Sequence, residues 1–553
     1  MKKQTFNFSK KIATIVVLMF LFNQVKSQSD SYFETSKNLE IFTDLYKELD
    51  MFYVDEINSG DLMKTAIEEM LISLDPYTTY IPESEIEDYR FMTTGQYGGI
   101  GAMITKRNNF VYISEPYEGF PAQKAGLMAG DKIIEINGVS AKGKSTEEIS
   151  SVLKGQPNTE VTILIERNEE KFTKKFNREK VTVKSIPYYG FVEDDIAYIK
   201  LRSFTRNCAN EIKNALIDLK SQKDVKGIIL DLRSNPGGLL NESIDIVNLF
   251  VEKGQEIVTT KGKIKDWEKT YIAKNKPLDI QTPLVVLINS SSASASEIVS
   301  GSIQDLDRGL VIGTKSFGKG LVQQTRKLPY NSQLKVTVAK YYIPSGRCIQ
   351  SLDYSNRNED GSVGKVPDSL TSIFKTRNGR EVRDGGGINP DIVIKNDELS
   401  DISISLLNKR LIFDFATQYR YNNQNISDIE NFTITQNIYN EFISFLSDKD
   451  YEYTTATEDA LDIFKDITDQ EGSTNLINDE LEQIIEKIKT NKNQDLEKNK
   501  KEIKTFLSSE IVSRYYYQKG RIIERLKHDN AVDEALRLLS NLDEYNSILK
   551  INE

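Results

Sequence analysis

The sequence predicts an α/β protein of several domains, in which helical regions at both ends enclose a β-rich segment and an alternating α/β core. Its length of 553 residues is that of about three or four domains. Hydrophobic residues make up 39% of the chain and charged residues 28%. This composition is typical of a globular protein, and it excludes a disordered chain, a collagen-like fibre and a multi-span membrane protein.

The net charge and the number of histidines exclude several classes of function. The chain carries 72 basic and 82 acidic residues, a net charge of −10, which disfavours nucleic acid as the main partner. His528 is the only histidine, so neither a Ser-His-Asp mechanism nor a zinc site with several histidines is expected. If the protein is an enzyme, its base is therefore not histidine, and we expect no metal and no cofactor.

The first 27 residues resemble a targeting segment. Four lysines precede an apolar run from Ile12 to Phe22, and the small residue Ser27 follows it closely. A basic start, an apolar stretch and a small residue are typical of a secretory signal. The run is shorter than the roughly 20 residues that span a bilayer. We therefore predict export through a cleaved signal at 1–27, and an uncleaved anchor remains the alternative.

Periodicity divides the rest of the chain into four regions. Leu39, Phe42, Leu45 and Leu49 recur at helical spacing, so helices follow the signal. Short strand-like runs with glycine turns come next, and then strand-like runs alternate with helical ones, which indicates an α/β layer. The last stretch is helical and rich in charge, and it predicts a scaffold on the core or a platform for substrates and partners. The regions are residues 28–92 (helical), 93–180 (β-rich), 181–398 (α/β) and 399–553 (helical).

A glycine-rich string opens the β-rich region. Gly98, Gly99, Ile100 and Gly101 precede a strand-like run that begins at Ala102. Three glycines in four residues let consecutive N–H groups turn toward one point and form a nest for an anion. A strand edge beside such a nest suits an extended peptide that ends in a free carboxylate.

The string continues in a way that resembles a PDZ domain. Residues 130–138 read Gly-Asp-Lys-Ile-Ile-Glu-Ile-Asn-Gly, and a short helix is indicated at 146–153. By this resemblance, the C-terminus of a substrate lies between strand 102–105 and that helix. Ile149 and Leu153 are then expected in its side-chain pocket.

A serine-rich turn carries the expected chemistry. The apolar strand Leu284–Ile288 runs into small residues around Ser294, followed by a helix. A helix N-terminus favours developing negative charge, but a serine hydroxyl needs a base before it attacks. Lys319 stands between two glycines after the strand Leu310–Gly313, and a buried lysine can serve as a base near neutral pH.

Two further segments complete the arrangement. Asp231–Gly238 follows a strand and ends in a Gly-Gly turn that can offer a backbone N–H to an oxyanion. Gln323 lies four residues after Lys319, so on a strand both side chains share a face. The glutamine oxygen can then hold the lysine amine in place.

These blocks together are very similar to the C-terminal processing peptidases, or tail-specific proteases, of serine peptidase family S41. The motifs are SASASEI, FGKG with VQQ, and DLRxNPGG, and the resemblance covers about residues 35–395. It implies a helical lead, a PDZ domain and a crotonase-like α/β core. Carried over by position, it implies Ser294 as the nucleophile, Lys319 as the general base and Gln323 as the residue that orients this base. It also implies oxyanion donors at the backbone amides of Ala295 and of Gly237 or Gly238. Asp305 matches an acid of the family, and a structural role is the alternative for it.

The resemblance implies an exported serine endopeptidase that recognises protein C-termini through its PDZ domain and forms an acyl-enzyme. Its partners would be protein or peptide substrates in the periplasm or envelope of a bacterium, with membrane contact only through an uncleaved signal. A non-catalytic PDZ adaptor is the alternative function. Homo-oligomerisation or an adaptor partner remains open, and so does whether Cys208 and Cys348 are free thiols or form one bridge.

Overall fold

The computed structural model describes residues 32–358, 362–367, 369, 371–395, 398–472, 474–492 and 494–550. The signal predicted at 1–27 lies outside these residues. The chain divides into two compact units, residues 1–80 and 81–553. In the first unit, a helix at residues 32–52 is followed by α2 (Ser59–Ile72), which begins where the Asn58 side chain accepts hydrogen bonds from the amides of Gly60 and Asp61. These helices agree with the expected helical start.

An antiparallel sheet forms the predicted PDZ domain of the second unit. The strand order is β3-β4-β5-β7-β8, with β6 on the edge of β5 and with β2 paired to β9 in a separate ribbon. Alternate residues such as Val111, Ile113, Ile163 and Ile165 are fully buried, which is the pattern of a sheet with one face on a core. The elements up to this point are β1 (Thr79–Ile81), a 3-10 helix (Glu83–Glu85), α3 (Ile86–Thr94), β2 (Gln96–Gly99), β3 (Ala102–Arg107), β4 (Phe110–Pro116), α4 (Pro121–Lys124), β5 (Lys132–Ile136), β6 (Val139–Ser140), α5 (Thr146–Leu153), β7 (Glu160–Arg167), β8 (Glu170–Asn177) and β9 (Glu179–Thr182).

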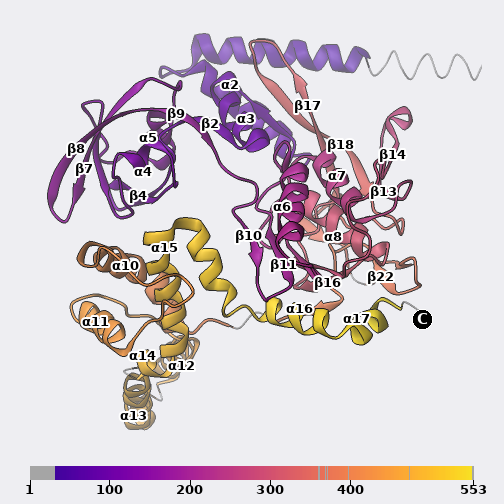
Figure 1. Cartoon of the computed structure of the whole chain (residues 1–553). Helices are drawn as coiled ribbons and strands as arrows, with labels where there is room; N and C mark the ends of the chain where they lie inside the picture. The colour runs from indigo at the N-terminus through magenta and orange to yellow at the C-terminus, as the bar shows by residue number, and fades with distance from the viewer. Residues whose placement is uncertain are drawn as a thin grey trace, which may run out of the picture. The chain divides into compact units, whose positions relative to one another are not determined.

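A six-stranded sheet forms the α/β core (Figure 1). Its order is β10-β11-β12-β15-β16-β23, in which β11 to β23 run parallel and β10 runs antiparallel to them at the edge. Strands β12 and β15 are buried along their whole length, as expected for parallel strands with helices on both faces. The strands are β10 (Tyr188–Phe191), β11 (Ile196–Lys200), β12 (Gly227–Asp231), β15 (Leu284–Ile288), β16 (Leu310–Gly313) and β23 (Ile392–Val393).

Two different sets of helices cover the faces of this sheet. Ile228 and Leu230 of β12 pack against α6 (Cys208–Gln222), α7 (Leu240–Phe250) and α8 (Ala295–Asp305). Their neighbour Ile229 points the other way, toward α16 (Asn530–Ser540) and α17 (Leu542–Leu549). We expected the α/β core within residues 181–398. Helices α16 and α17, from the C-terminal region, also belong to it, because they cover one face of its sheet.

A second antiparallel sheet and two hairpins extend the core. The sheet contains β14, β13, β18 and β17 in that order. The hairpins fall in the polar stretch after residue 351. The elements are β13 (Glu256–Gly262), a 3-10 helix (Lys265–Trp267), β14 (Lys269–Ile272), β17 (Leu321–Lys327), β18 (Gln333–Tyr342), β19 (Leu352–Arg357), β20 (Val363–Lys365), β21 (Ile373–Lys375) and β22 (Glu381–Arg383).

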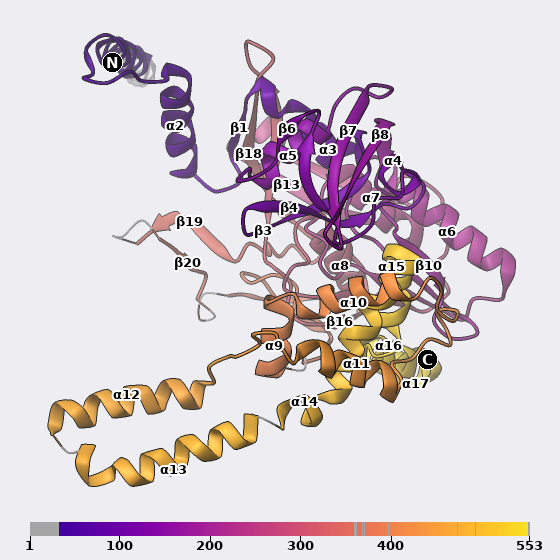
Figure 2. The same ribbon diagram turned by 90° about the vertical axis from the view of Figure 1, so that its left-hand side faces the viewer.

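The C-terminal region is helical, as the sequence predicted. Four of its helices, α9, α10, α11 and α15, enclose a separate core that contains Phe415 and Phe442. Figure 2 shows α12 and α13 as an antiparallel pair beside this bundle. The helices are α9 (Asp401–Asn408), α10 (Leu411–Asn422), α11 (Gln436–Leu446), α12 (Ala456–Glu471), α13 (Thr474–Lys492), α14 (Asp495–Lys498) and α15 (Lys500–Leu526).

The structure also shows the state of the two cysteines and the character of the helices. Both cysteines are free thiols, and burial raises the pKa of the Cys208 thiol. In the described part of the chain, no helix has the length and apolar character needed to cross a bilayer.

Candidate functional site

Three loops meet at the carboxyl ends of neighbouring parallel strands. Gly237 follows β12, Ser294 follows β15 and Lys319 follows β16, and these three strands are adjacent in the sheet. Ligands of open α/β sheets bind at this edge. A hollow of about 390 Å³ lies there, and its lining includes Ser294, Ala295, Gly237, Gly238, Lys319, Gln323, Lys335 and Tyr341. The structure therefore brings the expected nucleophile, base, orienter and oxyanion residues together.

Ser294 is held at a sharp turn directly before α8. Its backbone has φ 56° and ψ −109°, a conformation that costs a non-glycine residue about 1–3 kcal/mol. The neighbouring serines have other tasks, because the Ser292 hydroxyl donates to the Leu232 carbonyl and the Ser296 hydroxyl to the Asn235 carbonyl, both at 2.9 Å. Ser294 is the serine of this turn that lines the hollow.

Gly237 lies against Ser294, but its backbone amide already donates a hydrogen bond within its own loop. A Cβ at this position would stand 3.0 Å from the Ser294 Cβ and 2.7 Å from the Ala293 oxygen, so only glycine fits. The Gly237 N–H donates to Asn235 Oδ1 at 2.9 Å, which differs from the expected role as an oxyanion donor. Gly238 is the next residue and also lines the hollow.

Lys319 is half-buried and also lines the hollow. The ring of Phe317, two residues earlier in the chain, is 47% exposed and therefore does not bury the lysine. Gln323 lies on β17, and its amide nitrogen donates to Thr337 Oγ1 at 3.1 Å. This bond fixes the amide group and leaves the oxygen of Gln323 as the end that can accept from a lysine.

A buried carboxylate that we did not predict joins the loops that carry Ser294 and Lys319. Glu297 of α8 is fully buried and accepts four hydrogen bonds, from Ser294, Ser316, Gly318 and Lys319. Burial raises its pKa to about 7, against the lowering effect of the Ser316 hydroxyl and the three amides. A sequence signal for it existed, since Ser294 and Glu297 have the Ser-x-x-Glu spacing of a capping box.

Asp305 is not brought to the hollow. It is the last residue of α8 and stands 11 positions after Ser294, which places it about 16 Å along the helix from that serine. Its carboxylate forms an ion pair of 2.8 Å with Arg347, and both side chains are fully buried. It also accepts the Ser345 N–H at 3.0 Å. These contacts favour a structural role.

We expect Asp305→Ala to destabilise the fold by about 3–5 kcal/mol, because it leaves the Arg347 charge buried without its partner. Thermal unfolding checks this expectation. The double variant Asp305→Leu with Arg347→Met replaces the pair by apolar groups and is expected to recover most of the stability and activity. A well-folded double variant without activity would instead give Asp305 a part in the chemistry.

A hollow lies in the PDZ-like sheet, where the sequence predicted the peptide pocket. This hollow, of about 200 Å³, is lined by Phe91, Tyr97, Ile100, Ala102, Ile104, Tyr117, Ser150, Leu153 and Lys154. Of the expected residues, Ile100 and Leu153 line it, whereas Ile149, which is buried in the same domain core as they are, does not. Gly98 and Gly99 pair with β9 as part of a β-ribbon. Of the expected anion nest, only the backbone amides after Gly99 are therefore left to bind a carboxylate.

The two backbone amides that follow these glycines lie close to a tyrosine side chain. The N–H groups of Gly101 and Ala102 face the hydroxyl of Tyr97; burial raises the pKa of this hydroxyl and the two amides act to lower it. The Tyr97 ring lies over Gly99, where a Cβ would stand 2.6 Å from a ring carbon. A substrate carboxylate that binds these amides must therefore displace the Tyr97 hydroxyl.

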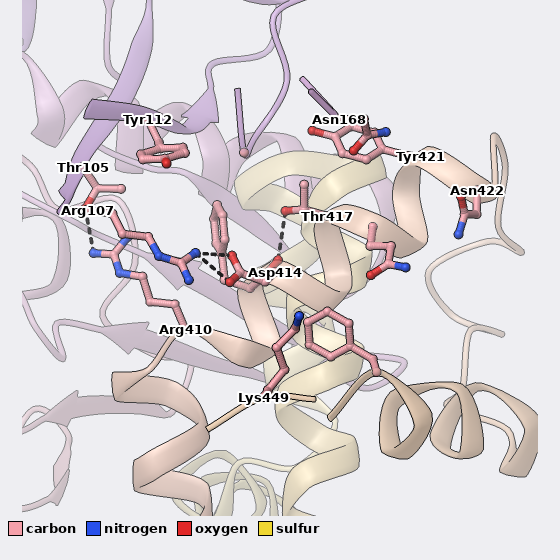
Figure 3. A pocket seen from close by; sticks show the side chains of 14 residues that line it. Thr105, Arg107, Tyr112, Asn168, Arg410, Asp414, Thr417, Tyr421, Asn422 and Lys449 are labelled. Carbon is pink, nitrogen blue, oxygen red and sulfur yellow. Dashed lines mark hydrogen bonds and ion pairs between the residues drawn. The ribbon is translucent and has the colours of Figure 1, made fainter. Parts of the chain in front are cut away.

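A third hollow, of about 480 Å³, lies between β3 and α10 and contains none of the expected residues. Figure 3 shows how its charged side chains pair: Arg107 binds Asp414 at 2.6 Å, and Arg410 donates to Thr105 at 2.6 Å. Because these groups satisfy one another across the hollow, we regard it as a polar joint between the β-rich domain and the C-terminal helices.

Comparison with known proteins identifies the parts of the chain. Residues 195–355 match peptidase family S41, residues 112–167 match the PDZ domain, and residues 402–539 match "Probable PDZ-protease, C-terminal helical domain". A carboxy-terminal-processing protease of Bartonella bacilliformis is 39% identical over 323 residues, which are 58% of this chain and 74% of the relative.

Two further relatives have similar names. A "Probable CtpA-like serine protease" of Staphylococcus aureus is 36% identical over 344 residues, 61% of this chain and 67% of its own length. A solved photosystem II D1 C-terminal processing protease is 26% identical with a TM-score of 0.36, over 65% of this chain and 93% of that one. The two bacterial protease relatives, at 39% and 36% identity, decide against the non-catalytic adaptor. The chain therefore belongs to peptidase family S41, as a C-terminal processing serine peptidase with a PDZ domain.

Proposed function

We propose that this peptidase cleaves by a Ser-Lys mechanism, with Ser294 as nucleophile and Lys319 as general base. The observation that supports it best is that both residues line one hollow at the carboxyl edge of the sheet. The only histidine, His528, lies between α15 and α16, away from this lining. Of the bases available near Ser294, a neutral lysine amine is the one that can accept a hydroxyl proton.

The reaction then proceeds through an acyl-enzyme. The Ser294 oxygen attacks the substrate carbonyl carbon while its proton passes to the Lys319 amine, and Gln323 orients that amine. The oxyanion receives hydrogen bonds from the amides of Ala295 and Gly238, because the Gly237 amide is already given to Asn235. Lys319 returns the proton to the leaving amine, and water later hydrolyses the ester by the same relay.

We further propose that the PDZ domain selects substrates by their C-terminus. The substrate carboxylate binds the Gly101 and Ala102 amides in place of the Tyr97 hydroxyl, and its last side chain contacts Ile100 and Leu153. The peptide itself extends along the free edge of β3. Helix α3 borders both sites, with Phe91 in this pocket and Met92 in the catalytic hollow.

Amidation of a substrate C-terminus is expected to weaken its binding roughly tenfold to hundredfold, because hydrogen bonds to a charged acceptor are worth about 1.5–3 kcal/mol. The measurement compares binding and cleavage of one peptide with a free and with an amidated end. Leu153→Asp is expected to reduce the difference, since it disrupts the pocket. Equal cleavage of both peptides by the wild type would exclude the PDZ domain from substrate selection.

Export is the last part of the proposal and depends on residues 1–27. The basic start, the apolar run and Ser27 support a cleaved signal, which would place the peptidase in the periplasm or envelope. N-terminal sequencing of the protein isolated from a bacterial host tests this. A mature chain that starts directly after Ser27 is expected, and an intact N-terminus would indicate the anchor.

A further inference from the structure

One carboxylate holds the main chains of both proposed catalytic residues. Glu297 Oε2 accepts the N–H of Ser294 at 2.7 Å and the N–H of Lys319 at 2.9 Å. Its Oε1 accepts the Ser316 hydroxyl at 2.6 Å and the Gly318 N–H at 2.7 Å. Ser294 and Lys319 follow different strands, so this single side chain bridges two loops.

The tyrosine Tyr341 supplies the complementary contact. Its hydroxyl lies at hydrogen-bond distance from the carbonyl oxygens of Ser294, at 3.1 Å, and of Lys319. The two residues are thus tied at their amides by Glu297 and at their carbonyls by Tyr341. Tyr341 is 1% exposed and Glu297 is fully buried, so solvent does not compete for these bonds.

We propose that Glu297 is a positioning residue that, as a carboxylate, sets the distance between the Ser294 hydroxyl and the Lys319 amine. This rests on the proposed Ser-Lys mechanism. An ionised carboxylate has only acceptors, which matches four donors that point at it. A protonated carboxyl group carries one O–H, which would meet an N–H donor and weaken the bridge. A displacement of about 1 Å between reacting groups can cost roughly a hundredfold in rate.

The ionisation of Glu297 is thereby linked to activity and to stability in opposite directions. Its pKa of about 7 predicts that the bridge, and with it kcat, is lost as the pH falls through 7. Because the folded pKa exceeds the ordinary value of 4.5, the charged form costs stability, which decreases as the pH rises from 4.5 to 7. The titratable residues around this carboxylate are Lys319, whose backbone N–H it accepts, and Tyr341 of β18, whose hydroxyl contacts the Ser294 and Lys319 carbonyls. On α8 itself, Asp305 is paired with Arg347.

Glu297→Gln is the decisive variant, because it keeps the shape and removes the charge. It is expected to lower kcat about tenfold to hundredfold with little change in KM, since the lesion lies in the reacting geometry. Its melting temperature at about pH 8 is expected to stay or rise, because no buried charge remains. A residue that only stabilises the fold would lower kcat and the melting temperature together, and that result would overturn the proposal.

Ser316→Ala provides a second test that keeps the carboxylate. It removes the one side-chain donor to Glu297, so the pKa of Glu297 should rise and the acid limb of kcat should move to higher pH. Both variants are compared with wild type and with Ser294→Ala in a pH–rate profile. Wild-type kcat in Glu297→Gln with an unmoved limb in Ser316→Ala would refute the proposal, whereas an active Ser294→Ala would refute the mechanism on which it rests.

Discussion

Ser294→Ala is expected to abolish proteolysis while the protein remains folded. Removal of a nucleophile costs several orders of magnitude in rate, roughly 10⁴-fold or more. The fold should tolerate the change, because Ser294 is tied to Glu297 and Tyr341 through its main chain, which alanine keeps. Single-turnover cleavage of a peptide substrate, together with a thermal unfolding curve, measures both parts of the expectation.

Ser291→Ala is the matched control for this variant. Ser291 is exposed in the same turn, three residues before the proposed nucleophile, and is expected to keep wild-type turnover. If Ser294→Ala also cleaved at the wild-type rate, the assignment would be wrong and Ser292 or Ser296 would need testing. Both of these are buried and donate to backbone carbonyls, which already argues against them.

Lys319→Arg is expected to be as inactive as the serine variant, although it keeps the positive charge. The guanidinium of arginine stays protonated and cannot take the proton of the Ser294 hydroxyl. Lys319→Ala should be equally inactive, because no other base then remains at the same place. Cleavage rates measured over about pH 6 to 10 distinguish a lost base from one whose titration has only moved.

Lys335→Ala is the control that tests whether Lys319, and not another lysine, is the base. Lys335 lines the same hollow from β18, so it is the other lysine that could take the proton. We expect Lys335→Ala to retain most of the rate at saturating substrate. An active Lys319→Arg enzyme together with an inactive Lys335→Ala enzyme would transfer the base to Lys335.

The fold class and the meeting of Ser294, Lys319 and Gln323 could be predicted because each signal is local. Apolar runs, glycine turns and a serine before a helix are visible in short windows, and parallel strands then bring their following loops to one edge. The roles of these residues remain predictions, which the variants above test.

Other features depend on contacts between distant segments. Glu297 stood in the serine motif, yet its bond to Lys319 appears only when the two loops meet. The amide of Gly237 turns to Asn235, and Leu153 lines the PDZ hollow while Ile149 does not, because packing decides between neighbouring positions. The amphipathic pattern of α16 predicts a buried face but does not say that the face covers the core sheet.

The most direct test of the Ser-Lys account is to identify the residue that a serine-directed fluorophosphonate modifies. We expect one adduct, at Ser294, by mass spectrometry of the digested protein, and a labelling rate that falls by orders of magnitude in Lys319→Arg. Ser291→Ala should label like the wild type. An adduct on Ser292 or Ser296, or undiminished labelling of Ser294 in Lys319→Arg, would contradict the account.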